Sequence, residues 1–151
     1  LVTMGAGAAP PVRGLRPVAA VAPGVAAATG LSLQQLAAAL VGQLRPAAVV
    51  CVDSLCSAEG QRLGRTVQFS DAGLYPAQAD HTRHLTRDTL GVPVVAAGIP
   101  TLMQAQEGAD LVVTPRALDS VIAHGAALLA GAVNRALQPR LTVQQLCWLT
   151  G

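Results

Sequence analysis

Two aspartates stand out because each follows a short run of residues typical of a β-strand. Asp53 comes directly after the apolar run 47–52, and Asp71 comes two residues after the run 66–69. In an open α/β sheet, loops and ligands meet at strand ends, so a carboxylate at such an end is available for chemistry. Two carboxylates that share one proton can act together, one activating a water molecule while the other donates the proton. The two aspartates are therefore the first candidates for a site.

Both aspartates also have simpler structural interpretations. Asp53 is well placed to cap a short helix predicted over residues 55–63. Asp71 lies between Ser70 and Gly73 in a good turn sequence, in which an aspartate bonds its own backbone and the glycine takes a positive φ. From its position at a strand end alone, Asp53 can have either a catalytic or a structural role. Asp71 can either form a turn or line a site.

Other combinations of reactive side chains carry a weaker signal. Ser54, Cys56 and Ser57 invite a nucleophile interpretation with His81 or His84, but no known spacing links them. The two histidines form an H-x-x-H pair in a polar stretch, where histidines are more often solvated than bound to a metal. The chain has three cysteines and no CxxC motif, which favours reduced thiols. These residues therefore give no strong signal for a metal site.

The composition indicates one small domain with a core of small aliphatic residues. The chain has 151 residues, 52% of them hydrophobic, but only one Phe, one Trp and one Tyr. All ten cations are arginines, dispersed along the chain, and the net charge is only +2, so a nucleic-acid partner is not expected. Pro, Gly, Gln or Arg interrupts each apolar run, so no membrane span is expected either. The chain does not begin with Met, and we expect its N-terminus to be incomplete.

The pattern along the chain alternates strands and helices. Residues 1–16 form an irregular lead-in and residues 17–151 a single α/β domain. Strands are expected at 17–22, 47–52, 66–69, 92–97 and 110–113. Helices are expected at 33–44 with Ser32 as N-cap, at 55–63, in one or two turns at 101–107, at 116–137 and at 141–149, with an exposed loop at 77–87. This order predicts a three-layer fold with a mostly parallel sheet flanked by helices.

A series of short segments along the chain forms a distinctive pattern. They are RPV at 16–18, APGV at 22–25, TGL at 29–31, VDSL at 52–55, TVQFSDAGLYP at 66–76, TLGVPVVAAGIPT at 89–101, VTP at 113–115, AG at 130–131 and NRAL at 134–137. In this order they resemble the spore germination proteases, a family of atypical aspartic endopeptidases. The similarity covers roughly residues 15–138, and several ordered segments are more specific than any one motif.

The resemblance carries specific expectations about fold and function. It implies an α/β fold like that of the hydrogenase-maturation endopeptidases and digestion of small acid-soluble spore proteins during germination. It further implies a zymogen, a homotetramer, a cytoplasmic location in the forespore or spore core, and no cofactor or metal. Family catalysis is attributed to two aspartates, one in a segment similar to 52–55, which carries the catalytic role to Asp53. Asp71, Ser54 and Gly73 are then possible lining of the site.

The chain departs from the family pattern in several places. The family's other catalytic aspartate, the first in its sequence, lies in a Thr-Pro-Asp-x-Leu-Gly-Pro segment after an N-terminal strand, and both would precede Leu1. The basic, glycine-rich loop after the Ser-Asp-x-Gly motif is replaced by residues 77–81, and a long insertion shrinks to residues 102–111. These departures leave an alternative open, a truncated or diverged inactive relative that only binds or assembles.

Overall fold

The computed structural model of the chain describes residues 15–24, 30–75, 84–104 and 112–150. Contacts within the chain divide it into two compact units. One unit runs from Pro23 to Ile122, and the other combines residues up to Ala22 with residues from Ala123 onward. The expected single domain over residues 17–151 stays a prediction, and the two units are described separately.

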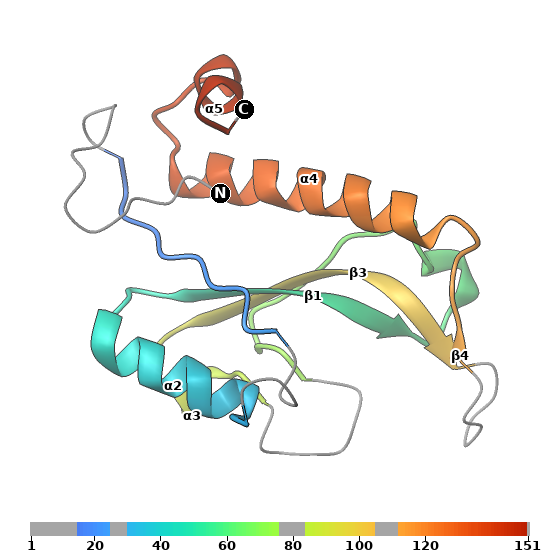
Figure 1. Ribbon diagram of the computed structural model, residues 1–151, viewed down its shortest axis with the longest axis horizontal. Helices are drawn as coiled ribbons and strands as arrows, with labels where there is room; N and C mark the ends of the chain where they lie inside the picture. Colours follow the sequence, from blue (N-terminus) through green and yellow to red (C-terminus); the bar gives the residue numbers. More distant parts are fainter. Residues whose placement is uncertain (1–14, 25–29, 76–83, 105–111, 151) are drawn as a thin grey trace. The chain divides into compact units, whose positions relative to one another are not determined.

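The first unit is built on a mixed sheet. Strands β1 (Val49–Ser57) and β3 (Val94–Gln104) run parallel, whereas β2 (Gln68–Ser70) and β4 (Val112–Val113) are antiparallel to β3. The order β1-β3-β2 leaves β1 at one edge among the described strands. The α/β class is confirmed. The expectation of a mostly parallel sheet holds only for the β1–β3 pair, which is the long pairing seen in Figure 1.

Two helices accompany this sheet, and both begin with a capping box. Helix α2 (Leu33–Leu44) starts at Ser32, whose hydroxyl accepts from the Gln35 N–H while the Gln35 side chain accepts from the Ser32 N–H. Ser32 is therefore the N-cap, as predicted. Helix α3 (Arg87–Leu90) uses Thr86 and Thr89 in the same way and lies in a stretch for which no helix was expected. Figure 1 shows α2 and α3 together on one side of the β1–β3 pair.

The buried core lies between that side of the sheet and the two helices. Side chains alternate along a strand, so alternate residues of β1, from Val49 through Cys51 to Leu55, share one face. The core members are Cys51, Leu74, Leu85, Leu90, Val94 and Ala96, and Leu33, Ala37, Val41, Val49, Leu55 and Val92 pack against them.

The opposite face of the sheet is apolar but exposed. Val52 is 55% exposed and Phe69 is 65% exposed, with Val50 and Val95 also accessible. The continuous apolar run at 47–52 was read as a central strand covered on both faces. In the part of the chain that the structure describes, β1 is an edge strand whose second face is open.

Two predicted helical segments are extended instead. Strand β1 continues through Asp53 to Ser57 where a helix was expected at 55–63, and only the 3₁₀ turn η1 (Gly60–Arg62) follows. Strand β3 likewise continues to Gln104 through the predicted helical turns at 101–107, of which 105–107 lie outside the described residues. In both cases pairing between β1 and β3 satisfies the backbone groups, with a bulge after Leu55, and this distant pairing overrides local helix propensity.

Smaller differences concern element bounds. The run 17–22 was expected to be a strand and has no regular secondary structure. The strand expected at 66–69 is confirmed in shortened form as β2, and the described part of the strand expected at 110–113 is confirmed as β4. Residues 110–111 and part of the expected 77–87 loop lie outside the described residues. Helix α4 (Leu118–Leu137) starts two residues later than predicted, and α5 (Val143–Thr150) confirms the predicted C-terminal helix.

Helix α4 is long and apolar enough to cross a membrane by length and composition. The expectation that no run approaches this length therefore needs correction. One such helix is weak evidence for a span, and α4 carries Asp119, His124, Asn134 and Arg135, which are costly in lipid. Length and composition alone therefore do not assign α4 to a membrane.

Candidate active site

The sequence suggested that Asp53 lies at the carboxyl end of its strand. In the structure it lies in the middle of β1. By strand alternation it shares the core-facing side of β1 with Cys51 and Leu55, yet Asp53 itself is exposed. The helix that it was expected to cap is absent, because β1 continues to Ser57. An accessible carboxylate on the side of the strand that otherwise packs into the core is unusual for a surface charge, and it marks the edge of the core as a candidate site.

The Asp53 carboxylate is oriented by the backbone N–H of the next residue. The Ser54 N–H donates to Asp53 Oδ1 at 2.8 Å. Among the described residues this is the hydrogen bond assigned to the carboxylate, which leaves the second oxygen available. The contribution of Ser54 to the site is thus its backbone N–H.

Gly98 of β3 lies next to Asp53 in the strand pairing. It pairs with Asp53 on one side and with Gln68 of β2 on the other, so the three residues form one row across the sheet. A Cβ at Gly98 would collide with the Asp53 carbonyl oxygen and approach Leu55 Cγ at 2.7 Å. Gly98 therefore permits close pairing of β1 and β3, and the Leu55 side chain occupies the space that a side chain at this position would take.

Sequence reasoning missed the roles of Gly98 and Gln68. Gly98 was interpreted as the residue that closes a strand, although a glycine inside an apolar run can equally signal close approach of another backbone. That signal was present. The alignment of Gln68 with Asp53 depends on the antiparallel pairing of β2, for which the local sequence carries no signal.

The pKa of the Cys51 thiol reflects the negative charge of the nearby Asp53 carboxylate. Burial raises the pKa of the Cys51 thiol, and the Asp53 carboxylate raises it further. The effect of Asp53 agrees with their position on the same face of β1, two residues apart. Cys51 is accordingly a protonated core residue at neutral pH and has no role as a thiolate nucleophile.

Asp71 does not come near Asp53. Because β2 is antiparallel, Ser70 pairs with Ala96, two residues from the row that contains Asp53. Strand spacing places the Cα atoms of Ser70 and Asp53 about 12 Å apart, and Asp71 lies beyond Ser70. Carboxylates share a proton at about 3 Å. In this register Asp71 cannot complete a pair with Asp53.

The turn that contains Asp71 is held by other residues. The Ser70 hydroxyl accepts from the Ala72 N–H at 3.2 Å. Gly73 has φ 102°, and a Cβ there would meet the Leu85 carbonyl oxygen. The glycine lets Leu74 and Leu85 exchange two backbone hydrogen bonds of 2.9 and 3.0 Å. Gly73 thus has a clear structural role, whereas the lining role of Asp71 and Gly73 stays a prediction.

The alternative nucleophiles have structural partners. The Ser57 hydroxyl is buried, donates to the Glu59 carbonyl and accepts from the Glu59 N–H, both at 3.0 Å. The His84 ring packs against Tyr75 in a tilted arrangement, with 4.8 Å between the ring centroids. His81 lies outside the described residues. The described stretches also contain no group of three or more His, Cys, Asp or Glu side chains that could hold a metal ion.

Comparison with known proteins places these residues in a family. Residues 10–107, which include Asp53, Gln68, Asp71 and Gly98, match the germination protease family model. Curated relatives named germination protease include those of Clostridium perfringens strain SM101, 28% identical over 180 aligned residues, and Halalkalibacterium halodurans, 37% identical over 113. The alignments cover 87% and 74% of this chain but 55% and 29% of the relatives.

A third relative, the germination protease of Bacillus subtilis strain 168, is 38% identical over 94 residues, covering 61% of this chain and 26% of that protein. The chain thus spans about half, or less, of the length of the curated relatives it matches. The family match extends over more than half of the chain. The chain belongs to the germination protease family of peptidases.

Proposed function

We propose that the protein is an aspartic endopeptidase that degrades small acid-soluble spore proteins during germination, with Asp53 as one of its two catalytic carboxylates. The observation that carries the proposal is the position of Asp53, exposed and oriented on the core-facing side of β1, within the segment that matches the family. In this mechanism an ionised carboxylate takes a proton from water while a protonated partner donates to the substrate.

The partner carboxylate has to come from outside the sheet. Strands β2, β3 and β4 contain no Asp or Glu, and the residues in the row of Asp53 are Gly98 and Gln68. The edge of β1 opposite β3 has no neighbour among the described strands, so a second carboxylate can approach Asp53 from that side.

The proposal extends to fold and assembly. We infer a three-layer arrangement like that of the hydrogenase-maturation endopeptidases, synthesis as a zymogen, assembly as a homotetramer and a cytoplasmic location in the forespore or spore core. The α/β class, the parallel β1–β3 pair and the family match support these inferences.

The test compares cleavage of a purified small acid-soluble spore protein by the full-length protein and by its Asp53→Asn variant. We expect Asp53→Asn to lower kcat by at least about 100-fold, the usual contribution of a general acid or base. Asp88→Asn is the matched control, because it removes the same charge from an exposed position in α3, outside the sheet, and it should retain cleavage within about threefold. Equal cleavage by wild type and Asp53→Asn would remove Asp53 from the mechanism.

Residues 1–151 alone should show little or no cleavage, because one carboxylate cannot fill both roles. The lack of a carboxylate in the row of Asp53 also favours a second candidate function for this chain, binding or assembly without catalysis. Robust cleavage by residues 1–151 would defeat both statements.

A further inference from the structure

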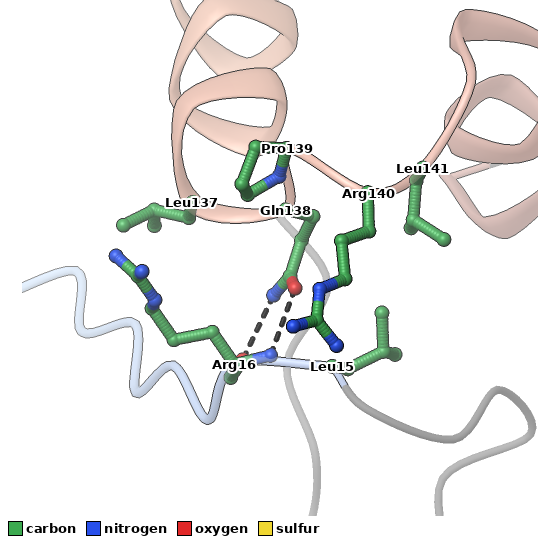
Figure 2. Close-up of a pocket in the computed structure, with 7 residues that line it drawn as sticks. All are labelled: Leu15, Arg16, Leu137, Gln138, Pro139, Arg140 and Leu141. Atoms are coloured by element: carbon green, nitrogen blue, oxygen red, sulfur yellow. Dashed lines mark hydrogen bonds between the residues drawn. The ribbon is translucent and has the colours of Figure 1, made fainter.

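A hollow of about 370 Å³ lies in the unit formed by the start and the end of the chain, separate from Asp53. Its volume falls within the range of about 300–1,000 Å³ that is usual for ligand pockets. Figure 2 shows its lining residues, which are Leu15, Arg16, Leu137, Gln138, Pro139, Arg140 and Leu141. The lining thus combines apolar side chains with two cations.

The backbone that carries Arg16 is held by one buried side chain. Gln138 is only 4% exposed, its Nε2 donates to the Arg16 carbonyl at 2.8 Å, and its Oε1 accepts from the Arg16 N–H at 2.8 Å. Gln138 therefore pairs with Arg16 as a neighbouring strand would, and both polar ends of its amide are satisfied. The Arg16 backbone is fixed while its side chain is not engaged.

The turn that carries Arg140 is held by a different arginine. Arg135 Nη1 donates to the carbonyl oxygens of Pro139 and Leu141, both at 2.8 Å. These two charge-assisted bonds fix the backbone on both sides of Arg140. Arg135 thus has a structural role, and it holds Arg140 in the lining of the hollow.

Arg16 and Arg140 themselves remain available for a ligand. Both are exposed, and no hydrogen bond or ion pair is assigned to either guanidinium within the described residues. In the view of Figure 2 the two guanidinium groups lie on opposite sides of the Gln138 side chain. Two cations carried by fixed backbone in the lining of a partly apolar hollow favour a ligand with two separated negative charges and an apolar group.

We propose that this hollow binds an acidic polypeptide segment in which two carboxylates flank an apolar side chain. Each guanidinium takes one carboxylate through its fork of N–H donors, and the apolar side chain contacts Leu15, Leu137 and Leu141. The apolar lining argues against inorganic phosphate, which has nothing to place there. This site is independent of Asp53 and adds a second point of contact for a protein partner.

The test measures binding of a fluorescein-labelled, C-terminally amidated peptide, Gly-Glu-Leu-Glu-Gly, to the chain by fluorescence anisotropy. The Arg16→Gln/Arg140→Gln variant should raise Kd by about 5- to 25-fold, because each exposed charge pair contributes about two- to fivefold. The Arg87→Gln/Arg116→Gln variant is the matched control, since it makes the same charge change at exposed positions in the other unit. Its Kd should stay within twofold of wild type.

Three further probes use the unmodified protein and are independent of whether any variant folds. Peptides with Gln in place of Glu, or Ser in place of Leu, should each bind at least about fivefold more weakly, and inorganic phosphate should displace the peptide only at millimolar concentrations or above. Equal binding of either altered peptide, displacement by micromolar phosphate, or an unchanged Kd for Arg16→Gln/Arg140→Gln would overturn the proposal. None of these measurements depends on proteolysis, so they stand apart from the test of Asp53.

Discussion

Replacing Gly73 with Ala should destabilise the first unit by roughly 3–4 kcal/mol. At φ 102°, a Cβ costs about 1–2 kcal/mol in backbone strain. It also meets the Leu85 carbonyl oxygen, a backbone atom that no rotamer change can move. Separating Leu74 from Leu85 breaks two hydrogen bonds worth about 1 kcal/mol each. Both leucines belong to the buried core, so the cost reaches the whole unit.

Gly91→Ala is the control that separates strain from collision. Gly91 also has a positive φ of 72°, but a Cβ there meets nothing within 4 Å. Its replacement should therefore cost only the strain, about 1–2 kcal/mol. The two variants differ in the contact that the added methyl group makes.

Urea unfolding followed by far-UV circular dichroism measures both variants against wild type. With a slope of about 1–3 kcal/mol per molar urea, Gly73→Ala should lower the midpoint by roughly 1–4 M. It should cost about 2 kcal/mol more than Gly91→Ala. If the two variants lose the same free energy within about 0.5 kcal/mol, the contact between Gly73 and the Leu85 carbonyl has no energetic weight and the reasoning fails.

Two further predictions concern the strand that carries Asp53. Because the pKa of Cys51 is raised above its ordinary value of 9.0, the stability that this thiol contributes is fully present below pH 9.0 and is lost as the pH rises through its pKa in the folded state. The free energy of unfolding between pH 7.5 and 10.5 should therefore fall more steeply for wild type than for Cys51→Ala. Parallel curves for the two proteins would contradict the raised pKa. Gly98→Ala should destabilise by about 1–3 kcal/mol in urea, because its Cβ forces β1 away from β3. Gly42→Ala, in α2 with nothing within 4 Å, should instead stabilise by about 0.5–1 kcal/mol, and a loss of stability there, or none for Gly98→Ala, would contradict this account.

The sequence predicted the local features of the fold well. Ser32 was identified as an N-cap because the capping signal lies within four residues, and α2 follows with the predicted bounds. The apolar run before Asp53 was correctly predicted to be a strand. Its end was wrong, because the pairing of β1 with the long strand β3 keeps Leu55 and Cys56 extended.

The arrangement of the candidate site could not be predicted in the same way. A mostly parallel sheet would bring Asp53 and Asp71 to the same edge, whereas the antiparallel direction of β2 sends Asp71 away from Asp53. Strand direction depends on contacts between distant residues, which local pattern does not encode. The grouping of Arg16 with Arg140 is hidden for the same reason, because the two residues are far apart in a chain whose arginines look dispersed.

The edge position of β1 has a consequence for the protein's solubility. Asp53 supplies the only charge in the nine residues of β1, which are otherwise suited to pairing with another extended chain. A charge in the middle of an unpaired edge strand disfavours edge-to-edge pairing of two copies and hence aggregation. The carboxylate proposed to act on substrate thus also keeps this strand from self-assembly, and a selection pressure for solubility would preserve it even in a relative that had lost its catalysis.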